Sequence, residues 1–218
     1  MKQTNRSRGL AGLYERHVLP RIVDKACGTK DITALRARVA VGLRGEVLEI
    51  GFGSGLNLPH LPATVDRLLA VDPARVGQKL AARRLANGRV PVEFVGLDGQ
   101  DVPLDDESVD TALVTFTLCT IPDPARALRE VARVLRPGGT IHFLEHGLSP
   151  DAPVAKWQRR LTPIQRKVFG GCHFDRPIDE LITAAGLEIV ELRNHYLRGP
   201  KTPSYLYEGI ARKVWSAA

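Results

Sequence analysis

Three glycines at alternate positions follow a short apolar run and could let the backbone approach a ligand closely. The run covers residues 47–50, and the glycines are Gly51, Gly53 and Gly55. Glycine permits sharp turns and leaves room for a bound group at the start of a helix. The next apolar run ends at Asp72, 21 residues beyond Gly51. A carboxylate at that distance can accept hydrogen bonds from both ribose hydroxyls of an adenosine ligand.

The glycine spacing favours a nucleoside with an amino-acid tail over a dinucleotide. The dinucleotide fingerprint places its third glycine three residues after the second, where this chain has Leu56. Without a pyrophosphate to bind, the turn needs only to receive the sugar and the tail. Glu49, in the preceding apolar run, could orient the neighbouring backbone and the ligand ammonium. An NAD-dependent oxidoreductase and an ordinary strand–helix turn stay alternatives.

Short apolar runs alternate with helical stretches through most of the chain. Apolar residues recur every three or four positions in 75–86 and 125–135, and Pro137-Gly138-Gly139 is expected to stop the second helix. This alternation predicts an α/β fold with a mainly parallel sheet and helices on both faces. The last two strands should pair antiparallel, because their loop is too short for a crossover helix. The predicted strands are 46–50, 67–71, 91–95, 109–116, 140–145, 187–194 and 205–212.

Two segments lie outside this alternation within the single domain that we predict over residues 1–218. Residues 1–40 carry apolar side chains at helical spacing and predict an N-terminal helical cap. Residues 149–175 follow the fifth strand, at the sheet edge where α/β proteins bind ligands, so they are expected to form a substrate-side insertion. Within it, 156–169 mixes five Lys or Arg residues with Trp157 and other apolar residues. This stretch could cover a substrate or contact a membrane surface, although Pro163 should interrupt its helix.

The composition is that of a globular chain with a basic surface. At 218 residues and 44% hydrophobic it can bury one full core, and its formal net charge is +7. The basic residues are spread along the chain without a nucleic-acid module, so we do not expect a nucleic-acid partner. Three cysteines without paired spacing predict neither a disulfide framework nor a metal site. The absence of a signal-peptide pattern and of an apolar run of about 20 residues predicts a cytoplasmic location.

Four sequence blocks occur in order along the chain: VLEIGFGSG (47–55), LLAVDPA (68–74), VGLDGQDVPLDDESVD (95–110) and LREVARVLRPGGTIHFLEH (128–146). Together they resemble class I methyltransferases that use S-adenosylmethionine (SAM), and the resemblance covers about residues 45–195. It implies a Rossmann-like, doubly wound sheet of seven strands with the last strand antiparallel. It also implies SAM as cofactor and S-adenosylhomocysteine as product. The cofactor-binding positions implied are Glu49, Gly51, Gly53, Gly55, Asn57, Asp72, Pro73, Asp98, Gly99, Gln100 and Thr115.

The same resemblance assigns roles on the adenine side of the cofactor. Asp98 would hydrogen-bond the adenine amino group, Gly99 and Gln100 would line the adenine slot, and Thr115 would lie beneath the cofactor. Asp98 as a turn residue and Thr115 as a strand residue are the alternatives. The stretches TFTLCTIPDP, FLEH and VFGGCHFDR resemble alkyl thiol S-methyltransferases, which implies a small-molecule acceptor, preferably a thiol. Quinone-type or other O- and C-methylation stays an alternative, as does RNA methylation.

Methyl transfer from a sulfonium needs no protein nucleophile, because the cofactor supplies an activated methyl group. A base matters when the acceptor must lose a proton. His146, just beyond the fifth strand, and His173, in the insertion, are candidates because imidazole titrates near neutrality. Glu145 is a further acid–base candidate. Cys172 could be a nucleophile, but because this chemistry needs none we expect a buried or incidental thiol. Each histidine could instead be a surface or hydrogen-bonding residue.

Overall fold

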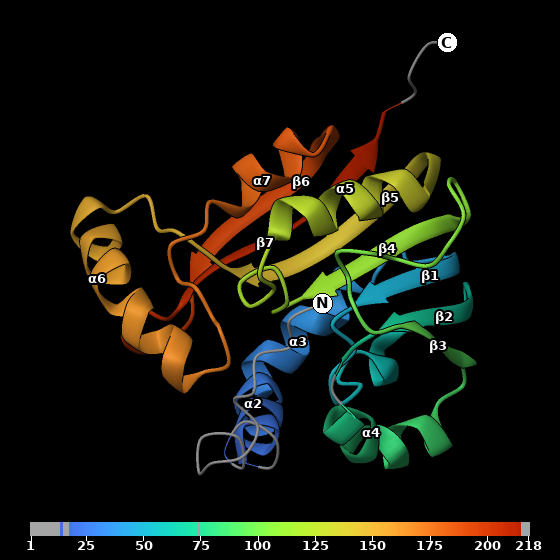
Figure 1. Cartoon of the computed structure of the whole chain (residues 1–218), viewed down its shortest axis with the longest axis horizontal. Helices are drawn as coiled ribbons and strands as arrows, with labels where there is room; N and C mark the ends of the chain where they lie inside the picture. The colour runs from blue at the N-terminus through green and yellow to red at the C-terminus, as the bar shows by residue number, and fades with distance from the viewer. Residues whose placement is uncertain (1–13, 15–17, 74, 215–218) are drawn as a thin grey trace.

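A central sheet of seven strands organises the computed structural model of this chain (Figure 1), which describes residue 14 and residues 18–73 and 75–214. The strands are β1 (Gly45–Ile50), β2 (Val65–Val71), β3 (Val92–Gly96), β4 (Val109–Thr115), β5 (Leu135–His146), β6 (Leu187–Tyr196) and β7 (Tyr205–Lys213). Their order in the sheet is β3-β2-β1-β4-β5-β7-β6. All neighbours are parallel except the two pairs that include β7. The predicted Rossmann-like sheet with an antiparallel last strand is therefore confirmed.

Helices cover both faces of this sheet. They are α2 (Leu19–Cys27), α3 (Lys30–Val39), α4 (Arg75–Asn87), α5 (Pro124–Val134), α6 (Ala152–Val168) and α7 (Ile178–Ala184), with a 3-10 turn η2 (Leu58–His60). On one face Leu128 of α5 and Ile178 of α7 are fully buried in the core. On the other face Leu35 of α3 and Ala81 of α4 belong to a second buried cluster. Both clusters anchor β1 and β4, whose carboxyl ends meet where the strand order reverses.

The N-terminal segment contains two described helices, where the sequence predicted a single helical cap over 1–40. Gly28 separates α2 from α3, and an added Cβ there would lie only 2.7 Å from the carbonyl oxygen of Asp24. A side chain at this position would therefore clash with the end of α2. Helix α3 packs on β5 and β7 and buries Leu35 and Val39. The part of the cap before residue 18 lies outside the described residues, apart from Tyr14.

The predicted helix 125–135 and strand 140–145 are both present, but β5 already begins at Leu135, so the predicted start of this strand is wrong. Leu135 has extended backbone angles and already pairs with Val109 of β4. The register between β4 and β5 then shifts between Val109 and Thr111, and Gly138 has a φ of +76°. Glycine tolerates this left-handed conformation, so it can shape an irregularity inside a strand. The Pro-Gly-Gly sequence therefore bends a strand here instead of separating two elements.

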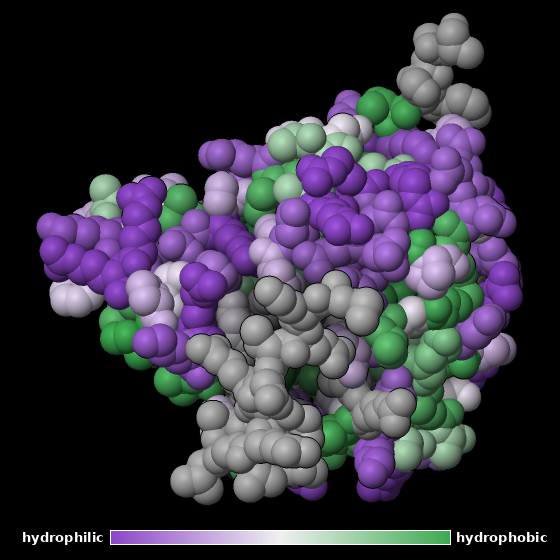
Figure 2. Space-filling model, in the orientation of Figure 1, coloured by the Kyte–Doolittle hydropathy of each residue, from purple (hydrophilic) through white to green (hydrophobic). Residues whose placement is uncertain are grey.

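The insertion contains α6, which lies on the side of the molecule toward which β1 and β4 point (Figure 1). Pro163 sits within this helix, so the predicted interruption is wrong. Proline removes one backbone donor from a helix, and Pro163 lies on an exposed part of α6. The buried Gln158 side chain donates to the carbonyl of Gly147 at 3.0 Å and ties α6 to the end of β5. Hydrophilic residues cover much of α6, with hydrophobic patches beside them (Figure 2).

Candidate cofactor and acceptor site

The glycine turn after β1 requires glycine at more than one position. Gly51, Gly53 and Gly55 have φ values of +81°, +55° and +73°, in the left-handed region that other residues rarely adopt. A Cβ on Gly51 would also lie 1.9 Å from the hydroxyl oxygen of Thr117. The loop that follows β4 therefore packs directly against this turn. The predicted glycine motif therefore lies at the carboxyl ends of β1 and β4, next to the loop after β4.

Asp72 directly follows β2 and lies beside this turn, as the sequence predicted. Its side chain is largely buried, and its Oδ2 accepts a hydrogen bond from the backbone N–H of Gly53 at 2.7 Å. This bond fixes the turn relative to the neighbouring strand. Pro73 follows and is exposed. A carboxylate held at this edge has the chemistry needed to accept the two hydroxyls of a ribose.

A buried polar network connects helix α3 to the carboxyl ends of β1 and β4. Arg36 donates through Nη1 to Asn57 Oδ1 at 2.8 Å and to Thr115 Oγ1 at 2.7 Å. Asn57 in turn donates to Glu49 Oε1 at 2.7 Å. Asn57 and Thr115, both predicted cofactor positions, thus lie next to Glu49. Arg36 could not be predicted, because an arginine in an N-terminal helix belongs to no motif that marks it as a site residue.

Glu49 offers an acceptor atom that the described residues do not use. Its side chain is buried, and Oε2 has no hydrogen-bond partner among the described residues. Burial raises the pKa of Glu49 to about 8, against the opposing effects of the Asn57 hydrogen bond and the Arg36 charge. A buried carboxyl oxygen without a partner is costly unless a donor or cation reaches it. The ammonium of an adenosyl amino acid is such a group, so this residue fits the predicted cofactor.

The predicted adenine side lies after β3. Gly99 is buried, and an added Cβ there would meet Ile50 at 2.4 Å, so only glycine fits. The Asp98 carboxylate is exposed and accepts hydrogen bonds from the backbone and side-chain nitrogens of Gln100, both at 2.9 Å, which lower its pKa. Gln100 also accepts a hydrogen bond from the backbone N–H of Asp123 at 2.9 Å. Together these contacts hold an ionised carboxylate at the end of β3.

Glu145 organises the loop that follows β4. Its buried carboxylate accepts backbone hydrogen bonds from Thr117, Leu118 and Cys119 at 2.7, 2.9 and 3.2 Å. Burial raises its pKa to about 7, although these hydrogen bonds oppose the shift. Phe116 precedes them with a φ of +53°, which a non-glycine residue holds only under local constraint. The carboxylate is thus engaged in holding the loop, and its predicted acid–base role stays a prediction.

The two candidate histidines lie in different surroundings. His146 sits between aromatic rings, with its ring centre 5.0 Å from that of Phe116 and 6.2 Å from that of Phe174. His173 is partly exposed, with Nδ1 3.7 Å from a carboxylate oxygen of Asp175. Burial, followed by the charge of Arg176, lowers the pKa of His173. Their roles as bases stay predictions.

Two cysteines that share no motif in the sequence lie close together in the structure. Cys119, His146 and Cys172 come together, with their ligand atoms within 4.8 Å of one another. A hydrogen bond from Cys119 lowers the pKa of the Cys172 thiol. Burial raises this pKa and the contact with His146 lowers it, so the net shift is downward. Cys119 donates this hydrogen bond to Cys172, and the bond and burial together raise the pKa of the Cys119 thiol. Cys172 is buried, as one of the two predicted alternatives has it, but its proximity to Cys119 and His146 could not be found from sequence spacing.

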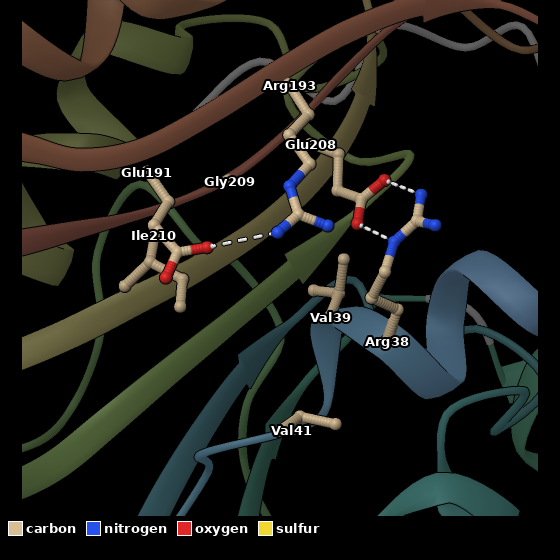
Figure 3. A pocket seen from close by; sticks show the side chains of 8 residues that line it. All are labelled: Arg38, Val39, Val41, Glu191, Arg193, Glu208, Gly209 and Ile210. Atoms are coloured by element: carbon tan, nitrogen blue, oxygen red, sulfur yellow. Dashed lines mark hydrogen bonds and ion pairs between the residues drawn. The ribbon is translucent and has the colours of Figure 1, made fainter.

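A surface recess of about 280 Å³ lies away from this site, between α3 and the middle of β6 and β7 (Figure 3). Its charged side chains pair with one another, Arg38 with Glu208 and Arg193 with Glu191. Glu191, Arg193 and Glu208 lie within β6 and β7, and Arg38 lies on α3. Paired charges over a strand face leave no group to hold a cofactor, so we place the candidate site at the carboxyl edge of the sheet instead.

Comparisons with known proteins identify the family. Residues 48–143 match the methyltransferase domain family. A thiol S-methyltransferase from Rattus norvegicus is 34% identical over 150 residues, which are 67% of this chain and 61% of that protein. A phosphatidylethanolamine N-methyltransferase from Cereibacter sphaeroides is 31% identical over 156 residues, 67% of this chain and 72% of that protein. Among solved structures, a SAM-dependent methyltransferase from Mesorhizobium loti superposes with a TM-score of 0.62 at 18% identity, over 85% of this chain and 98% of its own, and shows the shared fold.

These matches and the carboxyl-edge site define a class. The chain belongs to the class I SAM-dependent methyltransferases, and SAM is its cofactor. It spans about 60% of the length of the thiol S-methyltransferases that it matches. Among the described residues no helix is both long and apolar enough to cross a bilayer. The cytoplasmic location and the absence of a nucleic-acid partner stay predictions.

Proposed function

We propose that this chain transfers the methyl group of SAM to the sulfur of a small-molecule thiol. The observation that carries the proposal is the combination of the glycine turn, Asp72 and the unpaired Oε2 of Glu49 at one sheet edge. These features can hold the tail and ribose of SAM. The thiol preference is supported by the 34% identical relative from Rattus norvegicus, which is named as a thiol S-methyltransferase.

Each residue at this edge would contribute binding or orientation. Asp72 would accept the ribose hydroxyls, Glu49 would pair with the ammonium, and Asp98 would accept from the adenine amino group. The same cofactor site would be lined by Pro73, Gly99, Gln100 and Thr115. Bound SAM supplies an activated methyl group and a neutral leaving thioether. The chain would then accelerate transfer by holding the acceptor in line with that methyl group, which can contribute several kcal/mol.

The surroundings of the loop after β4 suit a soft, weakly acidic acceptor. Phe116 and Phe174 provide apolar contacts beside His146, and the guanidinium of Arg36 lies 5.2 Å from the centre of the Phe116 ring. A free thiol has a pKa of about 8.5, so part of it is ionised at neutral pH, and a nearby cation increases that part. The 149–175 insertion, tied to β5 through Gln158, would form a wall of the acceptor site. A peripheral membrane contact of this insertion stays a prediction.

One specific relative supports quinone-type C-methylation as a second candidate. A demethylmenaquinone methyltransferase from Clavibacter sepedonicus is 35% identical over 120 residues, 55% of this chain and 48% of that protein. A carbon acceptor would need a base more strongly than a thiol does, and His146 is the histidine that borders the aromatic contacts. The two candidates differ in the atom that becomes methylated.

An acceptor panel tests the proposal. The purified chain is incubated with SAM and with alkyl thiols, a quinol, a phenol or an amine, and products are identified by mass spectrometry. We expect methyl thioethers and stoichiometric S-adenosylhomocysteine from the thiols. Methylation of the quinol carbon alone would replace the thiol proposal with the second candidate. Failure of SAM and S-adenosylhomocysteine to bind in calorimetry would refute both.

A further inference from the structure

Two thiols and an imidazole from three distant segments meet at the loop that follows β4. Cys119 lies in the loop after β4, His146 ends β5, and Cys172 lies in the insertion after α6. One sulfur from each cysteine and a ring nitrogen of the histidine all lie within 4.8 Å of one another. Both cysteines are buried, with 1% and 7% exposure, and His146 is half-buried. The group therefore forms one compact cluster of soft ligand atoms.

We propose that Cys119, His146 and Cys172 bind zinc on the acceptor side of the site. Tetrahedral zinc with bonds of about 2.3 Å to sulfur and 2.0–2.1 Å to nitrogen keeps its ligand atoms about 3.6–3.8 Å apart. The observed cluster needs only small side-chain shifts to reach that geometry. Thiolate and imidazole are the ligand types that zinc prefers, and two thiolates would balance its charge.

The surrounding contacts already hold these side chains in place. The backbone N–H of Cys119 donates to Glu145 at 3.2 Å, and the carbonyl of Cys119 accepts from the N–H of His173 at 2.7 Å. Gln165 of α6 hydrogen-bonds Cys172, and the two phenylalanine rings flank His146. Supporting groups of this kind orient metal ligands and raise affinity. The loop with Cys119 and the insertion with Cys172 are thus fixed to each other by contacts outside the cluster.

Three protein ligands leave a fourth position on a tetrahedral ion, as catalytic zinc sites do. Cys119 stands two residues beyond Thr117, whose hydroxyl abuts Gly51 of the cofactor turn. An acceptor sulfur at the open position would therefore lie beside the loop after β4, which packs against the glycine turn. The acceptor thiol would bind as a thiolate, releasing its proton to solvent as the zinc–sulfur bond forms. This last step rests on the proposed thiol methylation, and in it His146 serves as a ligand and not as a free base.

Metal analysis of the full chain tests the site directly. Protein purified under reducing conditions is stripped with chelator, titrated with zinc against a chromophoric competitor, and loaded with cobalt for optical spectroscopy. We expect one zinc per chain, thiolate-to-cobalt charge-transfer bands, and a zinc absorption-edge spectrum with two sulfur neighbours. Absence of zinc uptake by the reduced chain, or a Cys119–Cys172 disulfide as the only change found, would overturn the proposal.

Single substitutions separate this site from the proposed function. Cys119→Ser and Cys172→Ser should each weaken zinc binding by more than the roughly 10–100-fold cost of losing a supporting group. Cys27→Ser, which changes the third cysteine outside the cluster, should bind zinc as the wild type does. Equal zinc affinity in all three variants would refute the ligand assignment. SAM calorimetry on the same samples distinguishes the two ideas: SAM binding without zinc uptake removes the metal site alone, and zinc uptake without SAM binding removes the proposed function alone. The spectra of the wild-type chain keep the test decisive should a variant fail to fold.

Discussion

Replacing Glu49 with glutamine tests whether this buried carboxyl receives the ammonium of SAM. In the free protein burial raises its pKa to about 8, and Oε2 has no partner among the described residues. At pH 7 the free protein therefore holds Glu49 mostly protonated. An ammonium beside it would favour the carboxylate, so SAM binding should release a proton. Glutamine keeps the acceptor for Asn57 and cannot release that proton.

The size of the effect follows from linkage between proton and cofactor binding. Below its pKa in the free protein, one proton released on binding raises SAM affinity by up to about tenfold per pH unit. Between pH 5.5 and 7.0 the wild type should gain up to roughly 30-fold in affinity. The range stops there because an α-amino group loses its own proton at about pH 7.7–8.0. Glu49→Gln should show little change across the same range.

Stability gives an independent measure of the same ionisation. Folding raises the pKa of Glu49 from its ordinary value of 4.5 to about 8. The folded protein therefore keeps a proton that the unfolded chain loses, and the free energy of unfolding falls as pH rises between these values. At pH 7 the accumulated cost is roughly 3 kcal/mol, at about 1.4 kcal/mol per pH unit. In Glu49→Gln this contribution to the slope should vanish, whatever the absolute stability of the variant.

Calorimetry in buffers of different ionisation enthalpy and urea unfolding at several pH values measure these two slopes. Glu46→Gln is the matched control, because Glu46 lies on the same strand and pairs with Arg67 at the surface. Its slopes should equal those of the wild type. Parallel slopes for wild type and Glu49→Gln in SAM affinity would refute the ammonium contact. Parallel slopes in stability would refute the buried, protonated state.

Three further substitutions test the candidate cofactor site and the fold. Asp72→Ala removes a charged acceptor and the tie to Gly53, and calorimetry should show SAM affinity lower by roughly 10–100-fold; unchanged affinity would contradict the placement of the ribose. Gly51→Ala places a Cβ 1.9 Å from Thr117 Oγ1 at a φ of +81°, so both SAM binding and the melting temperature should fall, and a variant that binds normally would show that the turn can move. Leu128→Ala, in the fully buried core, should cost about 2–5 kcal/mol in urea unfolding with SAM affinity retained; a loss below about 1 kcal/mol would contradict its burial.

The sequence predicted the strand ends that carry the candidate cofactor-binding residues better than it predicted the elements between them. Gly51 and Asp72 could be found because each directly follows an apolar run, and parallel strands bring such ends to one edge. The start of β5 was missed because Pro137-Gly138-Gly139 normally ends a helix, whereas here Gly138 bends a strand. Local signals of this kind cannot tell a loop from a bulge, since the difference depends on pairing with β4.

Arg36 and the cysteine cluster show why the acceptor side needed the structure. Arg36 lies 79 residues from Thr115, to which it donates at 2.7 Å, and Cys119 and Cys172 come from segments with no common motif. Their proximity depends on Glu145, which holds the loop after β4, and on the chain that returns from α6. The predicted cofactor side is built from residues next to strand ends, whereas the proposed acceptor side is built from loops that only the tertiary fold brings together. Changes in the insertion should therefore alter acceptor choice while leaving SAM affinity intact.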